Sequence, residues 1–168
     1  KYFEDISAIP HGSYNEKAIS AFIADTAAKL GLYARVDERN NVVVKKPATP
    51  GYEHLPAILL QAHVDMVNEK NSDSDHDFEK DGLKLILEGN ILRADGTTLG
   101  ADDGKGVAYM LALMDSDSDT FPHPPLEFLF TTGEEVGFWG AMALDCSDIT
   151  ARRMIGLDAG PEGVVATT

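Results

Sequence analysis

The stretch that decides the fold is Ala57-Ile58-Leu59-Leu60-Gln61-Ala62-His63-Val64-Asp65-Met66. It is short, it is bounded by turn-forming residues, and its apolar residues fall on both faces of an extended chain. These features are typical of a strand in the interior of a sheet, with other layers covering both of its faces. His63 and Asp65 lie at the end of this apolar stretch, so two polar side chains are expected where a buried strand ends.

Further strands and helices alternate along the chain around this strand. Short apolar runs predict strands at 42–44, 126–131 and 154–158. Apolar residues at helical spacing predict helices at 18–30, 104–114 and 139–144. The alternation predicts an α/β fold of three layers, in which a mixed, largely parallel sheet is the central layer.

Local signals predict how some of these elements begin and end. Ser13-Tyr14-Asn15-Glu16 fits a capping box, which predicts that the side chains of Ser13 and Glu16 close the first turn of the helix at 18–30. Gly31 is expected to end that helix. The polar segment 71–81 predicts a loop, and the alternating segment 83–93 predicts two short strands around Gly89-Asn90.

Composition excludes several classes of partner. The chain has 168 residues, of which 43% are apolar, enough for one domain with a buried core. Its formal charge of −14 repels nucleic acid phosphates and anionic membrane surfaces, so neither is an expected partner. No apolar stretch approaches the roughly 20 residues that span a bilayer. The single cysteine, Cys146, cannot form an internal disulfide, which fits a cytoplasmic protein.

The two ends of the sequence indicate a piece of a longer protein. The chain begins at Lys1 and has no initiator Met, and it ends in an apolar, strand-like run at 163–168 with no polar tail. We therefore expect that the sequence has been cut from something longer.

Acidic side chains gather where the expected strands end in glycine-rich loops. The clusters are His63-x-Asp65, Asp102-Asp103, Glu134-Glu135 and Asp158. Ligands of open α/β sheets bind outside the carboxyl ends of the strands, so these side chains can converge although they are far apart in sequence. Adjacent carboxylates repel one another, and a divalent cation is the usual counter-charge. One histidine with several carboxylates suits zinc, with manganese or cobalt as replacements.

Each cluster on its own has an ordinary structural explanation. His63-x-Asp65 could be a hydrogen-bonded pair in the core, and Asp102-Asp103 between glycines could form a turn. Glu134-Glu135 could open a helix, because acids are favourable at the positive end of the helix dipole. Clusters at three successive strand ends favour one shared site over three coincidences.

Two other motifs fail on inspection. Asp73-x-Asp75-x-Asp77 imitates a calcium loop, but Phe78 stands at the position of the turn glycine and Lys84 at that of the bidentate acid. Gly100 to Lys105 lacks the spacing and the Ser or Thr of a phosphate loop, and its two aspartates would repel a phosphate. Neither calcium nor a nucleotide is expected as a ligand.

Four stretches together resemble the aminoacyl-histidine dipeptidases (Xaa-His dipeptidases), whose wider relatives are the co-catalytic zinc aminoacylases and carboxypeptidases. The resemblance runs from about Ile9 to the end of the chain. It implies the zinc-exopeptidase fold and a metal-dependent dipeptidase. The stretches are Leu60-Gln61-Ala62-His63-Val64-Asp65-Met66-Val67, Asp95-Gly96-Thr97-Thr98-Leu99-Gly100-Ala101-Asp102-Asp103-Gly104, Thr132-Gly133-Glu134-Glu135-Val136-Gly137 and Leu157-Asp158.

The resemblance implies a ligand set for two zinc ions, for which manganese or cobalt could substitute. His63 and Asp158 would hold one zinc, Glu135 would hold the other, and Asp102 would bridge both. In the family the peptide bond that follows the bridging aspartate is cis, which here is the bond between Asp102 and Asp103.

Two further residues take catalytic roles by the same resemblance. Asp65 would orient His63 and so fix the ring nitrogen that faces the metal. Glu134 would be the general base that takes a proton from the attacking water and hands it to the leaving amine. The implied substrate is a small peptide of the Xaa-His type.

The sequence departs from the family's pattern in what it lacks. The family's second zinc takes a final histidine late in a longer chain, and the residues that grip the substrate lie on an inserted lid or dimerisation domain. Residues 1–168 would thus be the N-terminal part of the catalytic domain and inactive alone, and the full-length protein would form a homodimer through the absent domain. Histidines outside any matching motif are His11, His54, His76 and His123.

Three functions therefore stay open. The first is an Xaa-His dipeptidase, and the second is an aminoacylase or tripeptidase with the same metal chemistry. The third is a non-catalytic metal-binding module. The segment Asp158-Ala159-Gly160-Pro161-Glu162-Gly163 is less acidic than the family's run at this point, which leaves the subclass open.

Overall fold

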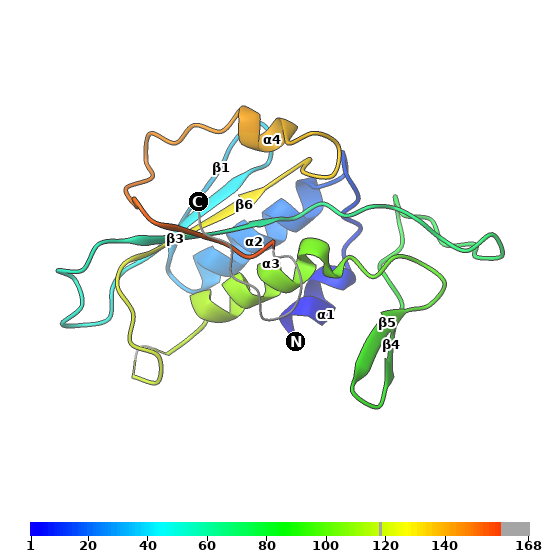
Figure 1. The fold of residues 1–168 in the computed structure, drawn as a ribbon, viewed down its shortest axis with the longest axis horizontal. Helices are drawn as coiled ribbons and strands as arrows, with labels where there is room; N and C mark the ends of the chain where they lie inside the picture. The colour runs from blue at the N-terminus through cyan, green and yellow to red at the C-terminus, as the bar shows by residue number, and fades with distance from the viewer. Residues whose placement is uncertain (118, 159–168) are drawn as a thin grey trace.

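The structure is a computed structural model that describes residues 1–117 and 119–158 (Figure 1). The expected apolar run at 163–168 and the segment 159–163 lie outside the described residues. Within the described part, a mixed five-stranded sheet is the centre of an α/β fold, which confirms the predicted fold class.

The central sheet has the strand order β1-β2-β6-β3-β7. Its strands are β1 (Tyr33–Val36), β2 (Val42–Lys46), β3 (Ile58–His63), β6 (Leu126–Thr131) and β7 (Met154–Gly156). The strand β3 pairs in parallel with both β6 and β7, whereas β2 pairs antiparallel with both β1 and β6. All six residues of β6 are buried, because this strand lies in the middle of the sheet and is covered on both faces.

Helices cover one face of this sheet and a mostly irregular segment covers the other (Figure 1). The helices α1 (Tyr2–Ser7), α2 (Lys17–Lys29) and α3 (Ala101–Met114) lie together on one face. They enclose the larger core with side chains of β2, β3 and β6. On the other face, Val43, Leu59 and Leu129 pack against the chain that follows α4 (Trp139–Met142). These layers agree with the predicted three-layer arrangement.

A separate two-stranded hairpin projects from the body of the molecule (Figure 1). It consists of β4 (Leu85–Glu88) and β5 (Ile91–Ala94), joined by the predicted turn at Gly89-Asn90. Leu87 and Ile91 are exposed on it, at 70% and 64%.

The predicted capping box at 13–16 is wrong. The helix α2 begins after Glu16, and no side chain caps its first turn. The hydroxyl of Ser13 instead donates to the carboxylate of Asp65, 2.8 Å away, and the carboxylate of Glu16 accepts the amide of Gly133 at 3.1 Å. Both residues therefore tie the start of this helix to loops that follow β3 and β6. Tertiary partners have replaced the local ones that the motif suggests.

Burial decides how much each leucine contributes to stability. Leu111, on α3, is fully buried in the larger core, whereas Leu87 on the hairpin is 70% exposed. In the complete protein, Leu111→Ala should lower the free energy of unfolding by about 2–5 kcal/mol, because it removes buried contacts and leaves a cavity. The matched change Leu87→Ala should cost no more than about 0.5 kcal/mol. Chemical denaturation of both variants checks this, and equal losses would contradict the core assignment.

Candidate metal centre

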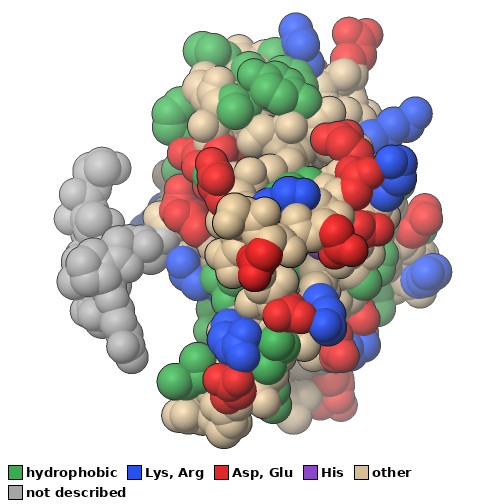
Figure 2. Space-filling model, turned by 90° about the vertical axis from the view of Figure 1, so that its right-hand side faces the viewer, with side chains coloured by type: hydrophobic (Ala, Val, Ile, Leu, Met, Phe, Trp, Pro, Cys, Tyr) green, Lys and Arg blue, Asp and Glu red, His purple; other side chains and the backbone are tan. Residues whose placement is uncertain are grey.

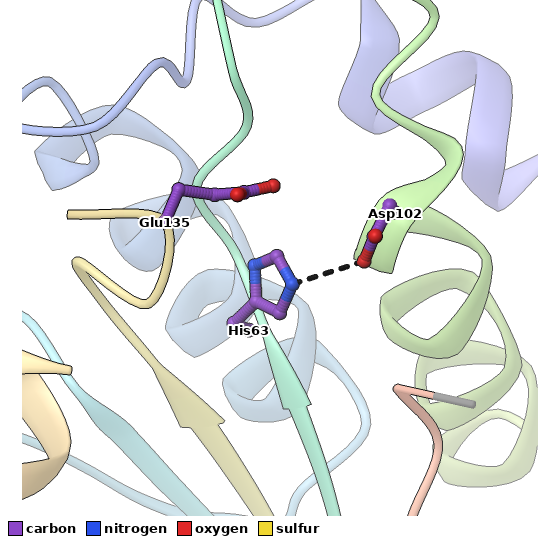
Figure 3. A group of neighbouring side chains, drawn as sticks. All are labelled: His63, Asp102 and Glu135. Carbon is purple, nitrogen blue, oxygen red and sulfur yellow. Dashed lines mark hydrogen bonds and ion pairs between the residues drawn. The ribbon is translucent and has the colours of Figure 1, made fainter. Parts of the chain in front are cut away.

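The carboxyl ends of three parallel strands bring the site residues together. His63 is the last residue of β3, Glu134 and Glu135 lie on the loop after β6, and Asp158 follows β7. Because these strands run in the same direction, their ends meet at one edge of the sheet. Asp102 reaches the same place from the start of α3. Figure 3 shows His63, Asp102 and Glu135 pointing toward a common space.

Distances show that this group is compact enough to hold a cation. The Nε2 atom of His63 lies 3.2 Å from an oxygen of Asp102. It also lies 4.0 Å from one carboxylate oxygen each of Glu134 and Asp158. One ligand atom from each of His63, Asp102 and Glu135 falls within 4.8 Å of the other two. An imidazole with carboxylates at this spacing is a donor set that zinc and related divalent metals accept.

Asp65 lies behind this group and fixes its neighbours. Its carboxylate is almost fully buried and accepts the amides of Glu134 at 3.0 Å and Glu135 at 3.3 Å. The Nδ1 atom of His63 lies 3.0 Å from the carbonyl oxygen of Asp65, which can only accept a hydrogen bond. A bond there requires the proton on Nδ1, which leaves the lone pair of Nε2 for a metal.

The start of α3 separates two adjacent aspartates. The peptide bond between Asp102 and Asp103 is cis, as the resemblance implied. The side chain of Asp102 is 69% exposed and faces the site, whereas Asp103 is fully buried and accepts the amide of Gly106 at 3.2 Å. Burial raises the pKa of Asp103 to about 6. The sequence shows two equivalent acids here, and only the backbone geometry tells them apart.

The electrostatics of the group favour a bound cation. Burial raises the pKa of Glu134 and of Glu135, and nearby aspartates raise them further. Burial acts to lower the pKa of His63, but its hydrogen bond to Asp65 and the charge of that carboxylate raise it to about 9. Acidic side chains are also spread over the face in Figure 2, in line with the charge of −14. A divalent cation would relieve the repulsion between the carboxylates.

The structure thus brings together all six side chains that the sequence singled out: His63, Asp65, Asp102, Glu134, Glu135 and Asp158. Sequence reasoning missed Ser13 and Glu16, which touch Asp65 and the loop of Glu134. The only signal for these two was the apparent capping box. A buried acid before a helix without a cap contact can be recognised only in three dimensions.

Comparisons with known proteins point to peptidases. Residues 41–153 match the family described as Peptidase family M28. The chain is 40% identical over 163 residues to the cytosol non-specific dipeptidase of Escherichia coli (strain K12), a match that covers 97% of this chain and 33% of that protein.

Solved structures give the same picture. The aminoacylhistidine dipeptidase from Vibrio alginolyticus superimposes with a TM-score of 0.91 and 41% identity, over 96% of this chain and 33% of that one. A tripeptidase from Staphylococcus aureus gives a TM-score of 0.80 and 26% identity, over 95% of this chain and 42% of that one. The chain therefore spans about a third of the length of the two dipeptidases.

No helix in the described part of the chain is long and apolar enough to cross a membrane.

The raised pKa of His63 predicts proton release on metal binding. With a pKa of about 9, the imidazole is protonated at pH 7.5 in the metal-free protein, and a metal must displace that proton. Zinc affinity should therefore rise with pH until about pH 9. Calorimetric titration of the complete metal-free protein at pH 7.5, in buffers of different ionisation enthalpy, counts the protons released.

Two histidine variants assign that proton. His63→Gln should release about one proton fewer than the unaltered protein, because the protonated group is gone. His54→Gln, a change at an exposed histidine outside the site, should release the same number as the unaltered protein. Equal proton release by His63→Gln and the unaltered protein would show that His63 is not a ligand.

Proposed function

Since the chain belongs to Peptidase family M28, we propose that the complete protein is a metal-dependent peptidase that hydrolyses dipeptides, chiefly of the Xaa-His type, at a two-zinc site. The observation that carries this proposal is the convergence of one imidazole and the carboxylates of Asp102, Glu134, Glu135 and Asp158 at one edge of the sheet. Manganese or cobalt could replace zinc with this set of donors.

We assign His63 and Asp158 to one zinc, Glu135 to the other, and Asp102 to both. The assignment is supported by the position of Asp102, because one of its carboxylate oxygens lies 3.2 Å from Nε2 of His63 and one lies within 4.8 Å of a carboxylate oxygen of Glu135. When bound, metals of this kind polarise the substrate carbonyl and make water more acidic.

Glu134 is the proposed general base. Its carboxylate is near His63 but outside the compact group of His63, Asp102 and Glu135, so it can face substrate and water. Burial and neighbouring acids raise its pKa, which makes its carboxylate a better proton acceptor. Glu134 takes a proton from the attacking water as that water adds to the peptide carbonyl. The proton then passes to the leaving nitrogen as the C–N bond breaks.

Residues 1–168 are the proposed N-terminal part of the catalytic domain. The chain spans about a third of the two dipeptidases, so two thirds of their length has no counterpart here. Within the described residues, the ligand group contains one imidazole. We expect the second metal to need a histidine from the rest of the protein, and substrate grip and dimer formation to need a lid or dimerisation domain. The 168 residues alone should therefore hydrolyse little. We also propose a cytoplasmic location, because the relative that is 40% identical is a cytosol dipeptidase.

A substrate panel tests this function. The complete protein is assayed with β-Ala-His, Gly-His, Leu-Gly, a tripeptide and an N-acetyl amino acid, before and after chelation and after zinc or manganese is restored. We expect metal-dependent cleavage of the His dipeptides. Cleavage of Leu-Gly at a similar rate would remove the Xaa-His preference, and cleavage of only the last two substrates would indicate a tripeptidase or aminoacylase. No cleavage at all would favour the non-catalytic metal-binding module.

Two neighbouring glutamates should respond differently to the same change. Glu134→Gln removes the base but no ligand, so kcat should fall by about a thousandfold or more while zinc per chain is unchanged. Glu135→Gln should lower the zinc content, because it weakens a ligand. Assays of kcat with metal analysis of both variants separate the roles. Normal turnover by Glu134→Gln would rule out the proposed base.

A further inference from the structure

The loop after β6 is held by its backbone amides. Four consecutive amides donate to side-chain oxygens that come from distant parts of the chain, at distances between 3.0 and 3.3 Å. The donors are Thr132, Gly133, Glu134 and Glu135, and the acceptors in that order are Asn41, Glu16, Asp65 and Asp65 again. A loop with this many fixed amides has little freedom to shift, and so its side chains keep their direction.

Glu16 is the unexpected member of this set. It is 2% exposed, and it caps no turn of the helix that follows it. Its carboxylate accepts the amide of Gly133, which is 117 positions away in the sequence. Burial of a carboxylate is costly unless hydrogen bonds compensate it. Burial raises the pKa of this one, and the backbone amides of Glu16 itself, Tyr14 and Gly133 act against that rise. The buried position of the Glu16 carboxylate is therefore better explained by its hydrogen bond to Gly133 than by packing.

Gly133 is confined from a second side by Trp139. A Cβ atom on Gly133 would lie 1.5 Å from Nε1 of the Trp139 ring, and the φ angle of Gly133 is +62°, which favours glycine. The backbone at Gly133 therefore packs closely against the indole ring while Glu16 binds its amide. Together the two contacts fix the point from which Glu134 and Glu135 project.

From this arrangement, and resting on the proposed function, we propose that Glu16 is a positioning residue for the Glu134–Glu135 pair. Its carboxylate holds Gly133 so that the next two side chains face His63 and Asp102. A displacement of about 1 Å at a catalytic group can cost about a hundredfold in rate. Loss of this bond should therefore reduce the chemical step more than it reduces substrate binding.

The alternative is that Glu16 only stabilises the start of α2. The two roles predict different losses. A stabilising residue would change the melting temperature and the exchange of amides at the start of α2. A positioning residue would change kcat and the exchange of amides in the loop 132–136.

The test uses two variants of the complete, metal-loaded protein. Glu16→Ala removes the carboxylate. Glu16→Asp keeps the charge but shortens the side chain by one methylene, so this variant can be measured even if Glu16→Ala fails to fold. The control is Asp25→Ala, which removes an exposed acid from α2, the helix that follows Glu16. Measurements are kcat, KM, zinc per chain, and hydrogen exchange of the loop 132–136 by mass spectrometry.

We expect kcat to fall by about 10- to 100-fold in Glu16→Asp, with KM within about threefold and zinc unchanged. Exchange in the loop 132–136 should become faster, and Asp25→Ala should match the unaltered protein. The positioning role would be overturned if the kcat of Glu16→Asp stayed within about threefold of that of the unaltered protein. It would also be overturned if Glu16→Asp lost kcat without faster exchange in the loop 132–136. These outcomes can be told apart from a failure of the proposed function, because the substrate panel and Glu134→Gln test that function separately and the exchange measurement needs no activity.

Discussion

The parallel pairing of β3 with β6 is the constraint on which the site depends. The register places His63 opposite Thr131, so both strands end at the same level. The chain after β3 then carries Asp65, and the chain after β6 carries Glu134 and Glu135. A slip of one residue would turn every side chain of β3 to the opposite face and move His63 away from the carboxylates. Both strands are covered on both faces, and the core therefore enforces the register that the chemistry needs.

The acids near this edge fall into two groups with different partners. Asp65, Asp103 and Glu16 are buried, and each accepts backbone amides. Asp102 and Glu135 instead turn their carboxylates toward His63. The carboxylates of the first group hold loops in place through these hydrogen bonds. The second group has no such amide partners among the described contacts and keeps its charge available for a cation. The same residue type thus builds the support and the candidate ligand set.

The sequence predicted the fold and the members of the site better than it predicted their supports. Apolar runs located β3 and β6 because buried strands leave a clear signal. The short edge strand β1 was not predicted, since its residues are all partly or largely exposed. Acidic residues directly after the predicted strands indicated that these side chains converge at one edge of the sheet. The roles of Ser13 and Glu16 were misread as local capping, because a sequence pattern shows neighbours along the chain and not partners across it.

The proposed pair of cations would balance the charge at this edge more completely than a single cation. Four carboxylates, those of Asp102, Glu134, Glu135 and Asp158, face His63 within the described part of the chain. A single divalent ion would leave the group with a net negative charge in a partly buried place, which is unfavourable. Two divalent ions would balance four carboxylates while His63 stays neutral, and the metals would displace its proton. Burial raises the pKa of Glu134 and of Glu135, and neighbouring acids add to that rise, whereas burial acts to lower the pKa of His63 and the carboxylate of Asp65 raises it to about 9. Without cations, the negative charges of the neighbouring carboxylates therefore favour protons on all three side chains.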